Sequence, residues 1–108
     1  MAELGASGVE AHVGGDVNGD GVFVLELGGE LDVSNFEEVR SKVDALLDAD
    51  PRRVVVDLTS LSFMDSSGIA LLVGIGNRVD ELRVRNPTPI VRRIIEICGL
   101  ADAVGLQG

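Results

Sequence analysis

The sequence predicts a single α/β domain built on a mixed or parallel sheet. β-rich runs at residues 22–27, 54–58 and 82–85 alternate with segments whose apolar residues recur at helical spacing. This order is typical of strand–helix–strand units. The run Val54-Val55-Val56 contains no polar residue, as expected for a strand that helices cover. A length of 108 residues suits one domain with one hydrophobic core.

The composition excludes several functional classes. Apolar residues make up 45% of the chain, which argues against disorder. With three Phe and no Trp or Tyr, the core must be built from Val, Leu and Ile, and no aromatic platform for nucleic-acid bases is available. The formal net charge is -9, so direct nucleic-acid binding is not expected. The acidic surface either keeps the protein soluble or faces a basic partner.

The first 27 residues are predicted to form a loose terminus followed by a β-hairpin. Residues 1–8 are small and lack periodicity, whereas residues 9–13 alternate like a short edge strand. Residues 16–21 match the first half of an EF-hand calcium loop, but its twelfth position is Leu27 instead of a bidentate acid. A hairpin turn is therefore favoured, and neither a metal nor a cofactor is predicted.

The first helix is predicted to begin at Ser34 and to end before Pro51. Ser34 and Glu37 have the spacing of a capping box, and the residue before a proline disfavours helical geometry. Five apolar residues in between fall on one face of the helix and should pack against the sheet; they are Phe36, Val39, Val43, Leu46 and Leu47.

The last helix is predicted to start after Thr88, which can cap it, with Pro89 at the first helical position. Gly99 ends the helix. Cys98 falls on the apolar face and is predicted to be a small buried residue. As the only cysteine, it excludes an internal disulfide and fits a reducing compartment.

A cytoplasmic location is predicted. The N-terminus shows no basic-then-apolar signal pattern. The longest apolar stretch, residues 69–75, is far too short to span a bilayer.

The segment Asp65-Ser66-Ser67-Gly68 is the main candidate site. It precedes a buried helix that starts at Ile69 and reaches about Val79, and it places a serine at the positive end of that helix. Two interpretations follow from the residue types. The polar residues form a strong helix cap, or Ser66 accepts a phosphate at a position where an anion is tolerated.

The sequence gives little support for catalysis. No His or Cys lies near Ser66, and the Gly-x-Ser-x-Gly turn of serine hydrolases is absent. The only lysine, Lys42, lies within a helix and outside any phosphate-binding loop. The only histidine, His12, has no partner at metal-ligand spacing. The chain is therefore not expected to be an enzyme.

Four motifs occur in a characteristic order along the chain. The first is Gly29-Glu30-Leu31-Asp32, and the second combines residues 55–58 with Phe63 to Gly68. The third is Pro89-x-Val91-Arg92-Arg93, and the fourth is Gly99-Leu100. With them, the sequence resembles the anti-sigma factor antagonist family, the bacterial STAS domain, over residues 9–105. The resemblance implies a four- to five-stranded mixed sheet with three to four helices packed mainly on one side.

The resemblance also implies a function and a set of partners. The unphosphorylated antagonist binds an anti-sigma factor that is also a serine kinase and so frees the sigma factor. Phosphorylation of Ser66 releases the antagonist, and a phosphatase restores it. No membrane insertion is implied. Carried over by position, the partner-binding residues are Asp32, Val33, Ser34, Asn35, Met64, Asp65, Ser66, Ser67, Gly68, Leu71 and Leu72.

Two alternatives stay open. One is a constitutive STAS regulatory subunit of a transporter or a stress-sensing complex, in which Ser66 only caps a helix. The other is a sensor of a small molecule such as a nucleotide or lipid. The chain also departs from the family pattern, because the segment between Gly68 and Pro89 is shorter by about one helical turn. That departure bears on which kinase is recognised.

Overall fold

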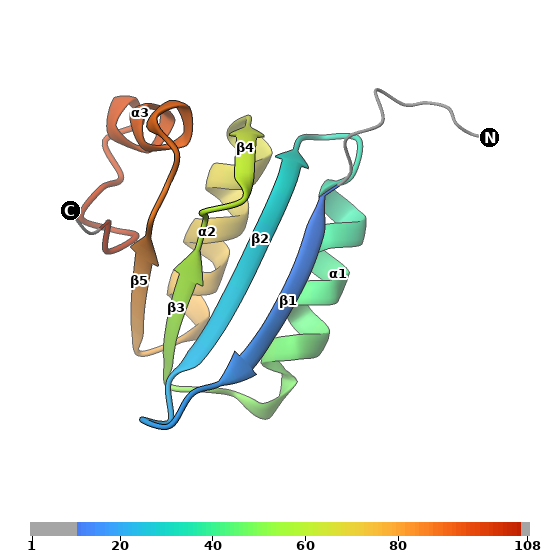
Figure 1. The fold of residues 1–108 in the computed structure, drawn as a ribbon, viewed down its shortest axis with the longest axis vertical. Coiled ribbons are helices and arrows are strands. Elements are labelled where there is room, and N and C mark those ends of the chain that lie inside the picture. Colours follow the sequence, from blue (N-terminus) through green and yellow to red (C-terminus); the bar gives the residue numbers. More distant parts are fainter. Residues whose placement is uncertain (1–10, 107–108) are drawn as a thin grey trace.

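A computed structural model describes residues 11–106 as a five-stranded mixed sheet with helices packed mainly against one face (Figure 1). The strand order is β1-β2-β3-β5, and β4 lies beside β2; β1 is antiparallel to β2 and all other pairs are parallel. The predicted fold class is thus confirmed. The elements are β1 (His12–Val17), β2 (Phe23–Leu31), α1 (Phe36–Leu46), a 3-10 turn η2 (Leu47–Ala49), β3 (Arg53–Asp57), β4 (Leu61–Met64), α2 (Ser66–Arg78), β5 (Glu81–Arg85) and α3 (Pro89–Ile97).

The nine-residue strand β2 organises the sheet because two short strands lie end to end beside it. β3 pairs with the first half of β2, and β4 pairs with its last three residues after a register shift at Gly29/Glu30. Gly29 has φ 85°, a conformation that favours glycine. The sequence did not indicate β4, so the strand that leads into Asp65 is β4 and not the predicted run at residues 54–58.

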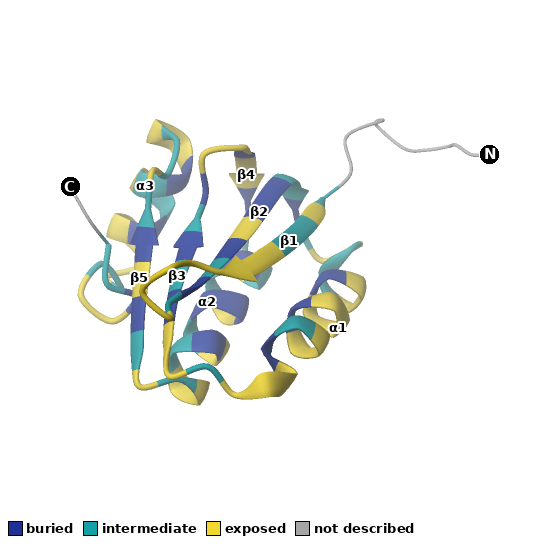
Figure 2. Cartoon of the chain, turned by 60° about the horizontal axis from the view of Figure 1, so that its bottom comes forward, coloured by how far each residue is buried: buried dark blue, intermediate teal, exposed yellow. Residues whose placement is uncertain are grey.

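The core lies between the sheet and the two helices α1 and α2 that cover one of its faces (Figures 1 and 2). As predicted, it consists almost entirely of Val, Leu and Ile; the exceptions among the buried apolar residues of 11–106 are Phe23 and Met64. No polar or charged residue in this range is buried. None of the helices formed by residues 11–106 is long and apolar enough to cross a membrane.

The start of α1 differs from the prediction. The helix begins at Phe36 with Asn35 as its N-cap residue, and no side chain caps it. The Ser34 hydroxyl donates instead to Asp32 Oδ1 over 2.5 Å, and Glu37 pairs with Arg40. The capping box is therefore wrong, because both of its side chains have closer partners. The predicted apolar face is confirmed: Val39, Val43 and Leu47 are buried and Phe36 and Leu46 pack against the core.

The hairpin is confirmed, but its first strand lies later than predicted. β1 runs through Gly14-Gly15 to Val17, and the turn is closed by a hydrogen bond from the Asn18 amide to the Val22 carbonyl, 2.9 Å long. No group of three or more His, Cys, Asp or Glu residues within 11–106 is arranged to hold a metal ion. The predicted flexible segment, residues 1–8, lies outside the described range, as does the start of the predicted domain at Val9.

Cys98 is exposed, which contradicts its predicted burial. α3 ends at Ile97, and its buried residues are Val91 and Ile95. Cys98 keeps a helical backbone conformation and its amide donates to the Ile94 carbonyl, so it is exposed because this end of α3 extends past the core, where Ile97 is also exposed. The predicted start of α3 is confirmed, since Thr88 Oγ1 accepts a hydrogen bond from the Val91 amide and Pro89 is the first residue of the helix.

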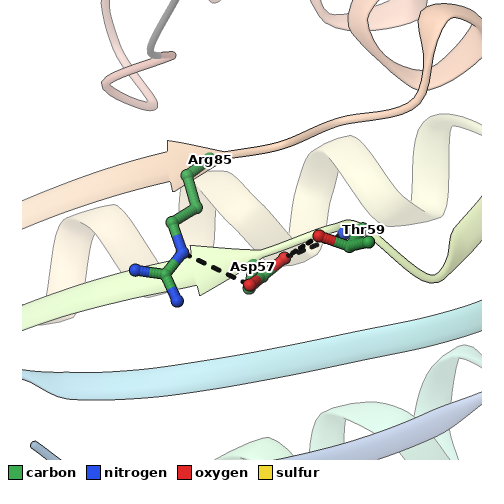
Figure 3. Close-up of polar contacts among 3 residues, drawn as sticks. All are labelled: Asp57, Thr59 and Arg85. Atoms are coloured by element: carbon green, nitrogen blue, oxygen red, sulfur yellow. Dashed lines mark hydrogen bonds and ion pairs between the residues drawn. The ribbon is translucent and has the colours of Figure 1, made fainter.

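Asp57 links three neighbouring segments at the end of β3 (Figure 3). Its carboxylate accepts hydrogen bonds from the hydroxyl and the amide of Thr59, and it forms an ion pair of 3.3 Å with Arg85 of β5. Partial burial acts to raise the pKa of Asp57. The hydrogen bonds from Thr59 and Arg85 outweigh that effect, so the pKa lies below its usual value.

Asp57→Asn is expected to remove a pH-dependent part of the stability. A lowered pKa in the folded state stabilises the protein above the unfolded pKa of about 3.9, and the gain is lost as the pH falls through the lower folded value. The variant should lose about 1 kcal/mol at pH 7, a modest figure because the Arg85 side chain is 41% exposed. Urea unfolding from pH 7 to pH 2.5 should show a shallower acid-side decline than in wild type. Asp48→Asn is the control, and equal pH profiles in both variants would contradict the assignment.

Candidate functional site

The parallel pairing of β2 with β4 brings together the two polar loops that follow these strands, at the carboxyl ends of the strands. Leu31 and Met64 are opposite each other at the ends of these strands, and the Asp65 amide donates to the Leu31 carbonyl over 3.1 Å. Parallel strands have their carboxyl ends at the same end of the sheet. Residues 32–35 and 65–67, called the paired loops below, therefore lie side by side. The sequence indicated both loops, and the structure joins them.

The first of the paired loops is held by two side chains. Asn35 Nδ2 donates to the Glu30 carbonyl over 2.8 Å, while its Oδ1 accepts from the Asp32 amide over 3.0 Å. Asp32 Oδ1 accepts from both the hydroxyl and the amide of Ser34. The Ser34 hydroxyl, followed by its amide, lowers the pKa of Asp32. The loop thus carries a fixed negative charge on a backbone that Asn35 ties down.

The second loop starts α2, with Asp65 as its N-cap. Asp65 Oδ1 accepts from the Ser67 amide over 2.8 Å, and its carbonyl accepts from the amides of Gly68 and Ile69. The cap predicted for this segment is confirmed, and Asp65 supplies it. Ser66 is the first residue of the helix and is exposed. Its hydroxyl makes no hydrogen bond to any residue of 11–106. The Ser66 hydroxyl is therefore accessible and is not needed for the fold.

Seven of the predicted partner-binding residues lie at the surface. Val33 stands out because it is an apolar side chain that is 77% exposed. Single exposed apolar residues are common on protein surfaces, so Val33 is a candidate contact because it lies on the paired loops with Asp65 and Ser66. The exposed members are Val33, Ser34 and Ser66, and the half-buried members are Asp32, Asn35, Asp65 and Ser67.

The other four predicted partner-binding residues lie beneath the surface. Met64 and Leu72 are each 1% exposed and Leu71 is 4% exposed, because they sit on the inward sides of β4 and α2. Gly68 is also buried, and a Cβ there would lie 2.7 Å from Met64 Cβ. Its lack of a side chain lets α2 approach β4 closely. These four residues therefore contribute to packing and not to the contact surface.

Phe63 is a surface residue that the sequence did not assign to the site. It lies on β4 directly before Met64, pairs with Glu30 of β2, and is 41% exposed. A signal was present, since adjacent residues of a strand point to opposite faces. A buried Met64 therefore implies an outward Phe63. The signal could not be used because β4 itself was not predicted.

Asn35→Ala is expected to destabilise the first paired loop. The substitution removes both Asn35 hydrogen bonds and leaves the Glu30 carbonyl without its amide partner, a loss of about 1–3 kcal/mol in unfolding free energy. Urea unfolding measures the change, and the amide exchange of Asp32 should accelerate. Ser34→Ala, which leaves both bonds in place, is the control. An Asn35→Ala protein as stable as wild type would show that the loop does not depend on this side chain.

Three comparisons with known proteins agree with this geometry. The STAS domain family matches residues 17–107. An anti-sigma F factor antagonist of Lysinibacillus sphaericus is 34% identical over 82 residues, which is 71% of this chain and 70% of that protein. The structure of an anti-sigma factor antagonist from Mycobacterium paratuberculosis superposes with a TM-score of 0.82 at 24% identity, covering 95% of this chain and 89% of the other.

The anti-sigma factor antagonist SpoIIAA is similar in two solved forms. Its unphosphorylated form superposes with a TM-score of 0.72 at 25% identity over 90% of this chain and 89% of the other. Its phosphorylated form, described as a Bacillus cell fate determinant, gives a TM-score of 0.65 at 24% identity over 90% of this chain and 92% of the other.

The chain belongs to the STAS domain family. Relatives that match it include two anti-sigma F factor antagonists and an anti-sigma-B factor antagonist. These names describe regulatory proteins and not enzymes, which agrees with the expectation from the sequence.

Proposed function

We propose that this protein is an anti-sigma factor antagonist whose binding to a kinase-type anti-sigma factor is controlled by phosphorylation of Ser66. The observation that carries the proposal is the exposed Ser66 at the start of α2, on the paired loops. The names of the relatives support the antagonist role, and SpoIIAA, a related antagonist, is known in phosphorylated and unphosphorylated forms.

The paired loops supply a contact surface of mixed character. Val33 of the paired loops and Phe63 of β4, the strand that leads into them, offer exposed apolar area, which provides most of the favourable energy at the centre of a protein interface. Asp32 and Asp65 add negative charge at the same edge of the sheet. A partner that docks here should therefore present an apolar patch bordered by basic groups.

Phosphate on Ser66 would change the charge of this surface and leave the fold intact. A phosphoserine adds about 1.5 to 2 negative charges. The helix N-terminus tolerates an anion, although Asp65 already occupies the amides of Ser67, Gly68 and Ile69. The phosphate would then rest against the Ser66 amide and the helix dipole and would extend toward the partner. Repulsion and bulk would release the partner, and a phosphatase would reverse the change, all in the cytoplasm.

Mapping of the phosphorylated residue tests the proposal. The protein is mixed with candidate kinase-type anti-sigma factors and ATP, and the modified peptide is identified by mass spectrometry. Incorporation near one phosphate per chain is expected on Ser66, none in Ser66→Ala, and normal incorporation in the control Ser67→Ala. Modification of Ser66→Ala at the wild-type level, or no modification of wild type by any candidate, would overturn the switch.

A further inference from the structure

The two outer edges of the sheet are treated differently by the chain. At β5, the Val84 amide donates to the Gly105 carbonyl over 2.9 Å and Val84 bridges to Leu106, so the C-terminal segment covers this edge. β1 pairs with β2 on one side. On its other side, no strand of residues 11–106 pairs with it. Within residues 11–106, β1 is therefore an open edge of the sheet.

The hairpin fixes which backbone groups of β1 point outward. The Asn18 amide donates to the Val22 carbonyl, and this pair continues the register that sets His12 opposite Gly28. In an antiparallel pair, hydrogen-bonded and non-bonded positions alternate. The even-numbered residues of β1 are therefore bonded to β2, and Val13, Gly15 and Val17 direct their amides and carbonyls outward. The Val17 amide is bonded to Asp16 Oδ1 over 2.8 Å, as expected for a group with no strand partner.

β1 lacks several of the features that usually prevent pairing at an edge. Its six residues, His12 to Val17, include no Lys, no Pro and no bulge. Gly14 and Gly15 present no side chain to an approaching strand. Val17 is 55% exposed, an apolar side chain left open at the end of the strand. Within the described chain, this edge is available to an extended partner.

We propose that β1 pairs antiparallel with β1 of a second copy, so that two sheets become one across a twofold axis at Gly14. The outward amides and carbonyls belong to odd-numbered residues, so an odd-numbered residue of one β1 must lie opposite an odd-numbered residue of the other. With Val13 opposite Gly15 of the second copy, His12 of each copy faces Asp16 of the other. An imidazole and a carboxylate then meet twice, once on each side of the axis.

Several registers place odd-numbered residues opposite each other, and charge complementarity selects this one among them. Moving one strand by two residues sets His12 opposite Gly14 or Asn18 and loses both imidazole–carboxylate pairs. The selected register also places the exposed Val17 opposite Ala11, an apolar residue of the core margin. A second copy therefore satisfies the amides of Val13 and Gly15, covers the exposed Val17 and forms two imidazole–carboxylate pairs.

This dimer is independent of the proposed switch. β1 contributes no residue to the paired loops, so Ser66→Asp should leave the dimer unchanged. Because each copy has a formal net charge of -9, the association should be weak and is best measured at an ionic strength that screens long-range repulsion.

Sedimentation equilibrium of the full chain from micromolar to millimolar concentration tests the dimer. Wild type should show a monomer–dimer equilibrium. His12→Asp sets like charges opposite each other twice and should raise the dissociation constant about tenfold, and the double variant His12→Asp with Asp16→His should restore it. Asn77→Asp, an added charge on the exposed side of α2, is the matched control. A wild type that is monomeric throughout, or a dimer that His12→Asp leaves unchanged, overturns the proposal.

Amide hydrogen exchange tests the register directly. Val13 and Gly15 should exchange quickly in dilute protein and become protected at high concentration, whereas Gly14 and Asp16 should be protected at both. Circular dichroism confirms that each variant is folded. Concentration-dependent protection of other segments with none at Val13 and Gly15 would assign the dimer to another surface and overturn the β1 pairing.

Discussion

Replacing Ser66 by aspartate is expected to weaken binding to the kinase-type anti-sigma factor about 100-fold. A charge placed against a complementary interface without a partner costs about 2–5 kcal/mol. Ser66 is exposed and its hydroxyl makes no hydrogen bond to residues 11–106, so the change should leave the stability of the domain within about 0.5 kcal/mol. Isothermal titration calorimetry with the purified partner measures the affinity, and urea unfolding measures the stability.

Ser66→Asn separates the charge from the shape. Asparagine has nearly the size of aspartate but carries no charge, so Ser66→Asn should bind within about fivefold of wild type if charge is the main cause of release. Equal affinity of Ser66→Asp and wild type would instead support a constitutive regulatory subunit in which the segment only starts a helix.

Replacing Leu72 by alanine is expected to lower the free energy of unfolding by about 2–5 kcal/mol, because the side chain is only 1% exposed. The affinity for the partner, measured per folded molecule, should not change. This result would place Leu72 in packing and not in contact, as its burial indicates. Chemical denaturation gives the first quantity, and calorimetry at a temperature where the variant is folded gives the second.

Val33→Ala is the matched counterpart. The side chain is 77% exposed, so its truncation should change stability by less than about 0.5 kcal/mol and weaken partner binding several-fold. The two substitutions therefore predict opposite patterns. A loss of affinity in folded Leu72→Ala with none in Val33→Ala would show that the partner contacts a rearranged surface.

The long elements of the fold could be predicted because each carries its own periodicity. β2 and β3 contain apolar runs, β5 alternates charged and apolar residues, and α1 and α3 have one apolar face. β4 could not be predicted in the same way. It has four residues with both ends buried and the middle exposed, a pattern that reflects pairing with β2 through a register shift. β1 was misplaced because Gly14-Gly15 resembles a turn, while pairing with β2 keeps it extended.

The residue types of the candidate site could be predicted from the sequence, but the burial of each residue could not. Asp65 and Ser66 have residue types typical of a helix start, and in the structure Asp65 is the N-cap of α2 and Ser66 is its first residue. The inward direction of Leu71 and Leu72 does not follow from the sequence, because the first turns of α2 are apolar on several sides. The role of Asn35 depends on contacts made after β2 and β4 have paired. Such long-range information is absent from any local pattern.

The hydrogen bond from the Asp65 amide to Leu31 makes the backbone beneath Ser66 continuous with the central strand of the sheet. With the backbone at Ser66 fixed in this way, the loop would return to the same conformation after each removal of phosphate. Each cycle of phosphate addition and removal would begin from the same binding surface. If Ser66 is phosphorylated as proposed, the response time of the regulator would be set by the turnover of the enzymes that add and remove the phosphate, and not by a conformational relaxation of the chain.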